Sequence, residues 1–336
     1  MAMEDYGTYK AGILLWKIVP PFLLLFGMTG NVLTFLTLTR KQLRHEAMSV
    51  FLAALSVSDF IALLTGLLRQ WIKYTFDVDI RVDLTVSGCR FHWFIVYVST
   101  QFSSWMLICV TIERGISTWM PHKRHLRYDV KGAGIAVAVT LGALICLDGH
   151  YLFGYSNVER LNENTTYIEK CVPSTKAYDN FVIYTWTWID LCVFYLIPMI
   201  VLLIGNSLII FKVLQSYRRS HAAIVPVTGT NTNGNRMSSL TKSLLLVSIL
   251  FIVCITPVVV YPIGQPYWQP GASDSKLAMM FFFEALANLF MYVNHSVNFV
   301  LYFLSGSRFR NEVKKLLCYR RVAPGTEITT VSRSGI

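Results

Sequence analysis

The sequence has 336 residues, of which 54% are hydrophobic and 15% are charged. Soluble domains contain roughly 45–50% apolar and about 25% charged residues, so this composition excludes an ordinary soluble enzyme. With 20 Gly and 11 Pro, the chain is neither collagen-like nor a low-complexity sequence. The net charge of +11 would favour nucleic acid in a soluble protein. Here the basic residues lie in short segments between long apolar runs, so they predict membrane orientation and no nucleic-acid binding.

Seven stretches are apolar and long enough to cross a membrane, which takes about 20 residues per helix. No internal repeat is visible, so these stretches are expected to form one all-α membrane bundle. The expected spans are residues 12–40, 47–73, 88–118, 132–154, 181–213, 240–265 and 277–304. The boundaries that follow are an N-terminus over 1–11, the bundle over 12–305, a membrane-surface helix over 306–319 and a tail over 320–336.

Basic residues predict the orientation, because cytoplasmic connections carry the excess of Lys and Arg. Most of the 30 Lys and Arg residues lie after the first, third and fifth spans and in the tail, whereas most acids lie on the other side. The sequence therefore predicts a plasma-membrane protein with an extracellular N-terminus and a cytoplasmic C-terminus. Residues 1–11 contain no cleavable signal, so the first span is expected to act as an uncleaved anchor.

Three covalent features agree with this topology. Asn164 opens an Asn-Thr-Thr glycosylation triplet in a loop expected outside, and Cys318 in the basic tail is a palmitoylation candidate inside. Cys89 and Cys171 lie at outer positions, where the environment is oxidising. We therefore expect a Cys89–Cys171 disulfide, whereas the cysteines within the spans are expected to be packed thiols.

Polar side chains inside the expected helices are costly in hydrocarbon, and each calls for a functional explanation. The leading set is one carboxylate in the second span with amides and a hydroxyl from three other spans, namely Asp59, Asn31, Ser103, Asn294 and Asn298. Oxygen ligands of this kind could hold a sodium ion with water. The alternative is a neutral, hydrogen-bonded knot that fixes helix packing, and the residues alone leave both interpretations open.

Several short motifs occur in order, each in the expected helix. They are Gly30-Asn31-Val32, Leu55-Ser56-Val57-Ser58-Asp59, Cys89 with Glu113-Arg114 further along the same span, Pro198, Phe251, Cys254-Ile255-Thr256-Pro257 and Asn298-Phe299-Val300-Leu301-Tyr302. In this combination the chain from about residue 12 to residue 319 resembles the rhodopsin-like (class A) G-protein-coupled receptors. The resemblance implies a receptor that binds an extracellular ligand and activates a heterotrimeric G protein.

The resemblance also implies roles for individual residues. Glu113 is expected to hold Arg114 until activation releases it towards the G protein, and Pro257 is expected to act as a hinge because it lacks an N–H. The switch residues are Glu113, Arg114, Phe251, Pro257, Asn298 and Tyr302. The sodium pocket of the family is matched by Asp59, Ser103, Asn294 and Asn298, which makes an allosteric sodium ion the one cofactor implied.

Five features depart from the usual pattern of this family. Ile255 stands where Trp is usual, Phe299 where Pro is usual, Gly115 where an aromatic is usual and Asn206 where Tyr is usual; no Trp occurs over 132–154. Helix count, disulfide and polar pocket survive these changes, so the departures concern activation rather than fold. They point to a divergent branch and leave its basal activity open.

Two common ligand classes are disfavoured by single positions. Val96 stands where receptors for amines carry an acid, and Tyr292 stands where opsins carry the Lys that binds retinal as a Schiff base. The outer half instead offers a largely aromatic and amide lining with few fixed charges, which suits a peptide. Its candidate ligand-pocket residues are Val96, Tyr97, Gln101, Tyr184, Trp188, Tyr261, Gln265, Glu284 and Tyr292.

A short neuropeptide, in the first instance an amidated one, is therefore the expected ligand. A lipid or another small non-amine ligand is the alternative, and interfacial anchoring is an equal alternative for Trp71, Trp186 and Trp188. The loop over 155–180 is long, polar and prone to β-structure, and in peptide-binding members of the family such a loop often forms a hairpin tethered to the third helix.

On the inner side, residues 309–317 carry basic and apolar faces with helical period, which predicts a helix lying on the anionic leaflet. Ser and Thr residues in the tail are candidate sites for a receptor kinase and arrestin. The terminal Ser334-Gly335-Ile336 could add a strand to a PDZ domain.

An enzyme and a transporter fit the sequence less well. The chain has no HExxH, GxSxG or Walker motif and its seven His are scattered, so it is not expected to be an enzyme. A transporter would show internal repeats or paired broken helices. Asp59 and Glu284 are midplane acids, but no repeat accompanies them, so a transporter is the remote alternative.

Overall fold

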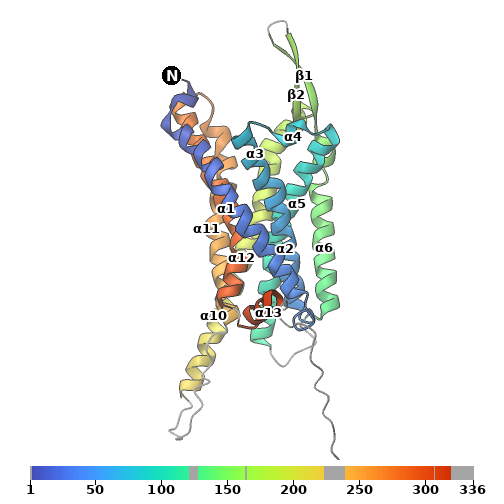
Figure 1. Cartoon of the computed structure of the whole chain (residues 1–336), viewed down its shortest axis with the longest axis vertical. Helices are drawn as coiled ribbons and strands as arrows, with labels where there is room; N and C mark the ends of the chain where they lie inside the picture. The colour runs from blue at the N-terminus through green and yellow to red at the C-terminus, as the bar shows by residue number, and fades with distance from the viewer. Residues whose placement is uncertain (1, 121–127, 163–164, 223–238, 306, 319–336) are drawn as a thin grey trace, which may run out of the picture.

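The computed structural model describes residues 2–120, 128–162, 165–222, 239–305 and 307–318. Within these residues seven helical segments are long and apolar enough to cross a membrane, and they pack as one bundle (Figure 1). The segments are Gly7–Leu38, Ala47–Phe76, Val86–Trp119, Val130–Gly154, Lys176–Gln215, Leu245–Trp268 and Asp274–Leu304. The seven-span fold expected from the hydropathy pattern is thereby confirmed.

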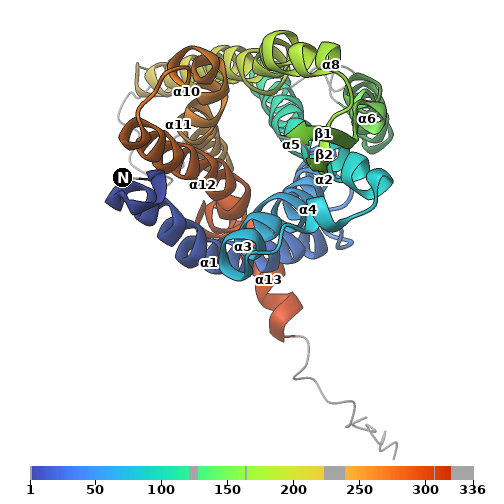
Figure 2. The same ribbon diagram turned by 90° about the horizontal axis from the view of Figure 1, so that it is seen from above.

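The structure describes fifteen helices and strands besides its 3-10 and π-helical segments. In order they are α1 (Gly7–Leu38), α2 (Ala47–Ala62), α3 (Leu68–Phe76), α4 (Ile80–Asp83), α5 (Val86–Trp119), α6 (Val130–Asp148), α7 (Tyr151–Gly154), β1 (Tyr155–Asn162), β2 (Thr165–Pro173), α8 (Lys176–Asn180), α9 (Thr187–Asp190), α10 (Ile197–Ala222), α11 (Ser239–Trp268), α12 (Asp274–Ser305) and α13 (Ser307–Cys318). Figure 2 shows the helices arranged as a ring in which α12 lies beside α1.

Among the residues that the structure describes, three short stretches of π-helix interrupt the spans. One, over Leu63–Leu67, joins α2 to α3, and the other two, over Phe181–Trp186 and Leu191–Leu196, flank α9 in the fifth span. A π-turn holds an extra residue compared with an α-turn, so it rotates the face that every later side chain presents. A regular α-helical period therefore does not predict which side chains of the fifth span face the bundle beyond these turns.

The largest differences from the expected helix ends are in the first and fifth spans. α1 begins at Gly7 rather than at residue 12, so residues 7–11 are helical and do not form a separate N-terminal segment. The Tyr9 ring lies 4.7 Å from that of Phe281 in α12, which gives this first turn a partner that hydropathy does not reveal. The fifth span begins at Lys176 and α10 continues to Ala222, beyond the expected limit of residue 213.

The first and last spans pack closely through a glycine. A Cβ atom on Gly30 would lie 2.8 Å from the Cβ of Phe299, so only glycine allows this approach. Phe299 occupies the position where proline is usual, and α12 is accordingly an unbroken helix through it. α11 instead carries three prolines, Pro257, Pro262 and Pro266, each of which removes a helical N–H donor.

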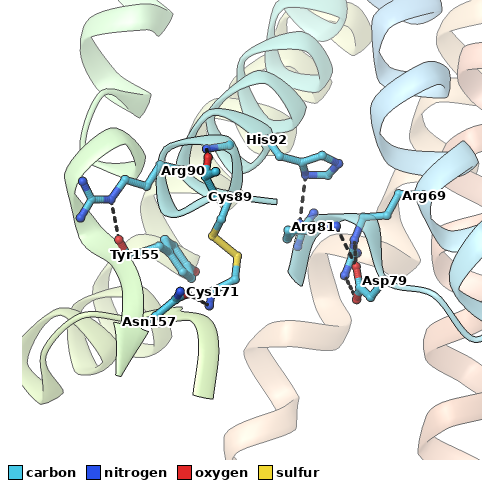
Figure 3. Close-up of a disulfide and its surroundings, with 11 residues drawn as sticks. Arg69, Asp79, Arg81, Cys89, Arg90, His92, Tyr155, Asn157 and Cys171 are labelled. Atoms are coloured by element: carbon cyan, nitrogen blue, oxygen red, sulfur yellow. Dashed lines mark hydrogen bonds and ion pairs between the residues drawn. A yellow bond between two sulfur atoms is a disulfide. The ribbon is translucent and has the colours of Figure 1, made fainter. Parts of the chain in front are cut away.

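The connection between α7 and α8 forms the expected β-hairpin, tethered to α5. β1 and β2 pair antiparallel with an irregularity between Ser156 and Val158. The Cys89–Cys171 disulfide joins β2 to α5, with the two Cα atoms 5.8 Å apart (Figure 3). Asn157 Oδ1 accepts the backbone N–H of Cys171 at 3.1 Å, which supports the left-handed φ of +57° at that cysteine.

α13 lies at the opposite end of the bundle from the hairpin (Figure 1). Its apolar side is buried through Phe309 and Val313, and the Glu312 carboxylate lies 3.2 Å from the Arg40 guanidinium after α1. The structure thus forms the helix predicted from the basic and apolar pattern, and Cys318 is its last residue. Asn164 and the tail over 320–336, with its phosphorylation and PDZ candidates, lie outside the described residues.

Candidate functional site

A cavity of about 300 Å³ opens at the hairpin end of the bundle, between α3, α4, α5, α11, α12 and the fifth span. Six of the nine residues predicted for a ligand pocket line it, namely Val96, Tyr97, Tyr261, Gln265, Glu284 and Tyr292. The glycine at position 66 leaves space for the Tyr292 side chain, because a Cβ there would lie 2.5 Å from the hydroxyl of Tyr292. A cavity of this volume lies at the lower limit of ligand pockets, which span about 300–1,000 Å³.

Tyr184 and Trp188, which were predicted as pocket residues, do not line this cavity. They are 58% and 52% exposed on the outside of the fifth span, whereas Trp186 between them is 3% exposed. Trp186 packs 4.1 Å from the ring of His150, in an aromatic cluster beneath the hairpin. The π-helical turns over Phe181–Trp186 and Leu191–Leu196 explain the difference from the predicted orientation, since they change which face the side chains present.

Gln101 is also outside the cavity, fully buried within the bundle. Its amide Nε2 donates to Asp148 Oδ1 at 3.3 Å and to Asp190 Oδ1 at 2.9 Å. One amide thus serves carboxylates from two different spans, and Asp190 also lines the cavity. Gln101 is therefore a support for the cavity wall rather than part of its surface.

The cavity carries more charge than the aromatic and amide lining predicted from the sequence. Arg69, Arg81, Asp190 and Glu284 all line it. Sequence reasoning missed Arg81 because this residue lies in a short helix between two spans. Whether its side chain points into the bundle depends on how that helix packs against α3 and α5. Asp79, the N-cap of this helix, was the available signal: its Oδ1 accepts the backbone N–H of Arg81 at 3.2 Å.

Arg69 is neutralised within the protein by Asp79. The Arg69 Nε atom lies 2.8 Å from Asp79 Oδ1, and Nη2 bonds the other carboxylate oxygen, so the pair is bidentate (Figure 3). Lys73 Nζ lies 3.6 Å from the same carboxylate. Burial alone would raise the pKa of Asp79, but the hydrogen bond and charge of Arg69 outweigh it and lower that pKa below its ordinary value.

A second polar centre surrounds Asp59, in the middle of the bundle. Asp59 Oδ1 accepts the Ser103 hydroxyl at 2.6 Å and lies 2.7 Å from His295 Nδ1, while Oδ2 accepts the Asn298 amide at 2.7 Å. The Asn31 amide donates to the His295 carbonyl at 3.0 Å, which links α1 to α12. Residues from four spans therefore converge here, as the sequence alone could not show.

His295 is the residue of this centre that sequence reasoning missed. The predicted set contained Asn294 instead, which is buried but is not among the described partners of Asp59. The two positions are adjacent in α12, so only the rotation of that helix against α2 decides which one meets the carboxylate. A titratable side chain inside a span was the signal that could have singled out His295.

The residues present do not fit a sodium ion at Asp59. Asp59 Oδ1 already accepts the Ser103 hydroxyl and lies within hydrogen-bond distance of His295 Nδ1, and Oδ2 already accepts the Asn298 amide, so side chains of the protein engage both carboxylate oxygens. Sodium instead requires oxygen lone pairs directed at the ion. Asn298 Oδ1 is a buried oxygen with no partner among the described residues, and it does not by itself make a cation site.

Two of the predicted switch residues, Glu113 and Tyr302, lie towards the α13 end of the bundle, whereas Asn298 belongs to the centre around Asp59. Glu113 is buried and accepts the Ser117 hydroxyl at 3.2 Å and the Tyr128 backbone N–H at 3.4 Å. Its ion pair with Arg114 stays a prediction. Tyr302 is buried, and its ring lies 6.1 Å from that of Phe309 in α13. A movement of α12 would therefore change a packing contact with α13.

The departures from the family pattern have structural counterparts in α11 and α5. Ile255 and Phe251 are fully buried, and the Phe251 ring stacks 6.3 Å from that of Tyr195. The Tyr195 hydroxyl meets Thr256 Oγ1 at 2.5 Å, directly before Pro257. A Cβ on Gly115 would meet nothing within 4 Å, so no other side chain fills the space beside this glycine where the family usually has an aromatic residue.

Comparison with known proteins gives a consistent family. The family described as seven-transmembrane receptors (rhodopsin family) matches residues 30–302. Galanin receptor 2b of Danio rerio is 25% identical over 320 residues, covering 94% of this chain and 78% of the relative. G-protein coupled receptor 65 of Homo sapiens is 25% identical over 252 residues, covering 72% and 67%, and neuromedin-U receptor 2 of Mus musculus is 22% identical over 321 residues, covering 91% and 78%. These proteins are receptors and not enzymes.

Proposed function

Because the chain belongs to the rhodopsin family of seven-transmembrane receptors, we propose that it binds an extracellular peptide in the cavity and activates a heterotrimeric G protein at the opposite end of the bundle. The observation that carries the proposal is the cavity itself. Aromatic, amide and charged side chains from five spans and from α4 wall it, beneath a hairpin held by a disulfide. Such a mixed lining can bond peptide amides and stack aromatic side chains.

The relatives support a peptide rather than an amine. Two of them bear the names of galanin and neuromedin-U receptors, which are peptide receptors. In this chain Val96 lines the cavity at the place where an amine receptor would present a carboxylate. A short neuropeptide is therefore the proposed ligand, with a lipid or another small non-amine molecule as the outcome if peptides fail.

We propose that the hairpin end is extracellular and the α13 end cytoplasmic. The N-terminus lies at the hairpin end (Figure 1), and a disulfide forms and persists in an oxidising environment. The basic connections and α13 then face the anionic leaflet, where Lys and Arg are favoured. Glycosylation at Asn164, palmitoylation at Cys318, and a tail that meets a receptor kinase, arrestin and a PDZ domain complete the proposal.

The test is G-protein activation in cells that express the chain, screened with short synthetic peptides. Arg114→Ala is expected to abolish any response because the family uses this arginine to contact the G protein. Arg308→Ala is the matched control, since Arg308 is an exposed arginine at the same end of the bundle. A response that persists in Arg114→Ala would contradict the switch. Silence to all peptides at confirmed surface expression would contradict the peptide proposal.

A further inference from the structure

We infer that Arg81 is the anion-recognition residue of the cavity, and that the ligand presents a carboxylate to it. The inference rests on the proposed function, because it names the chemistry of the ligand held at the same site. It also changes the expected ligand. An amidated C-terminus has no charge to offer a guanidinium, whereas a free carboxylate matches it in charge and shape.

The fold places Arg81 in the cavity wall through the short helix α4. Asp79 caps this helix by accepting the backbone N–H of Arg81, and the side chain then turns into the bundle. The residue is only 8% exposed, and it lines the cavity together with Trp93 of α5. Its guanidinium carbon lies 3.6 Å from the centre of the Trp93 ring, which holds the group flat against an aromatic face.

The neighbours of Arg81 orient the guanidinium without neutralising it. Its Nε donates to His92 Nδ1 at 3.0 Å (Figure 3), and His92 Nε2 lies 3.0 Å from the carbonyl oxygen of Thr65. A carbonyl only accepts, so Nε2 carries the hydrogen and Nδ1 is the acceptor of a neutral imidazole. Within the described part of the chain, no carboxylate oxygen lies within 4 Å of the Arg81 nitrogens, and its two terminal nitrogens have no partner.

Asp79, the acid whose charge acts on Arg81, is already paired with another cation. Asp79 gives both oxygens to Arg69 and has Lys73 within 3.6 Å, so three cations share one carboxylate in this part of the cavity. Burial, followed by the charge of Arg69, lowers the pKa of Arg81 to about 9, which still leaves the group protonated at pH 7. A protonated guanidinium with two free terminal nitrogens presents a fork that a carboxylate fills with two parallel hydrogen bonds.

Two parts of a peptide can supply the carboxylate: the free C-terminus and an Asp or Glu side chain. The probes are three small molecules that differ at this point. N-acetyl-tryptophan carries a terminal carboxylate, N-acetyl-tryptophanamide is its uncharged match, and the α-amide of N-acetyl-glutamate carries only a side-chain carboxylate. Thermal unfolding of the purified full-length receptor in lipid nanodiscs reports binding of each probe, because a ligand of the folded state raises the unfolding temperature.

We expect at least one of the two carboxylate probes to raise the unfolding temperature and the tryptophanamide not to do so. The probe that succeeds identifies the source of the carboxylate. Arg81→Gln is expected to weaken binding of that probe by about 10- to 100-fold, the loss expected for a charged hydrogen bond. Arg81→Lys should retain part of the binding as a point charge, and Arg160→Gln, an exposed arginine of the hairpin, should bind as the wild type does.

Several outcomes would overturn the inference. They are an equal shift with acid and amide, no shift with either carboxylate, and full binding in Arg81→Gln. The acid-against-amide comparison on the wild type needs no variant, so a variant that does not fold leaves the test intact. The assay does not involve a G protein, so its result is separate from that of the proposed function. Conversely, activating peptides that contain no Asp or Glu and that work equally well as C-terminal amides and as acids would support receptor function and refute the carboxylate.

Discussion

His295 and Asp59 form a buried pair at the centre of the bundle, with Nδ1 of the imidazole 2.7 Å from Oδ1 of the carboxylate. The pair joins α12 to α2, and Ser103 and Asn298 complete the donors around the same acid. In a low-dielectric interior an ionised acid requires such compensation. Here the protein supplies it from its own side chains, so the centre acts as a polar link between spans.

This pair predicts that the receptor is insensitive to sodium. The unfolding temperature of the wild type should be the same in sodium chloride and in potassium chloride at equal ionic strength. His295→Ser removes the imidazole, leaves space and adds a hydroxyl oxygen, so this variant is expected to gain stability from sodium but not from potassium. The further change Asp59→Asn should remove that gain. Stabilisation of the wild type by sodium would show that the ion displaces the imidazole, contrary to expectation.

Gln101 is expected to stabilise the bundle through the two carboxylates that it serves. Gln101→Leu keeps the volume but removes the donor to Asp148 and Asp190, which should lower the free energy of unfolding by about 1–3 kcal/mol. Thermal unfolding of the purified variant measures the loss. Gln265→Leu is the control, because its amide bonds the exposed Gln269 and its loss should change stability by less than about 0.5 kcal/mol. Equal effects of the two changes would refute this role.

The Arg69–Asp79 pair predicts a dependence of stability on pH. The pKa of Asp79 is lower in the folded protein than in the unfolded chain, so its contribution is fully present above the unfolded pKa of about 3.9 and is lost as the pH falls through the folded value. The difference in unfolding temperature between wild type and Asp79→Asn should therefore be constant from pH 7 to about 5 and shrink below about pH 4. Asn retains the acceptor that caps α4.

Arg69→Gln offers a second measurement of the same pair. Arg69 supplies the hydrogen bond and the charge that lower the pKa of Asp79. This variant should therefore lose stability at pH 7, and its unfolding temperature should depend on pH in the same way as that of Asp79→Asn. The double variant should be no worse than the more damaging single change. Additive losses would indicate that the two side chains stabilise the receptor separately.

The disulfide predicts a large and specific effect of its cysteines. Cys89 and Cys171 are 82 residues apart, and closing a loop of that size stabilises a folded chain by about 4–5 kcal/mol. Cys89→Ser, Cys171→Ser and the double variant should show the same loss of unfolding temperature and of surface expression. Cys146→Ser, which alters an exposed thiol in α6, should behave as wild type. A double variant clearly worse than either single one would contradict the pairing.

Much of the architecture could be predicted from composition and pattern. Long apolar runs require helices in a membrane, because every backbone polar group must be bonded within its own segment. Loop charges, the two outer cysteines and the β-prone loop likewise carry local signals, and the structure forms the helices, the disulfide and the hairpin that they indicate. The additional helical residues 7–11 depend on the contact of Tyr9 with Phe281, which no local signal predicts.

The two functional centres could be predicted only in part. Asp59, Ser103 and Asn298 were identifiable because polar groups are rare inside spans, and Tyr97, Gln265 and Glu284 were identifiable as outer-half polar and aromatic residues. Which face of a helix meets its neighbours is decided by packing. That choice brought His295 rather than Asn294 to Asp59 and turned Tyr184 and Trp188 outward.

The sequence by itself determined the number of spans, the pairing of the outer cysteines and the family, because these depend on local hydropathy and on short motifs. Only the tertiary structure decided which charges are neutralised and which are available. Arg69 and Arg81 are both arginines near the same end of the bundle, yet Asp79 forms an ion pair with the first and caps the helix that carries the second. Charge compensation acts over a few ångströms between segments, and sequence spacing does not encode such distances.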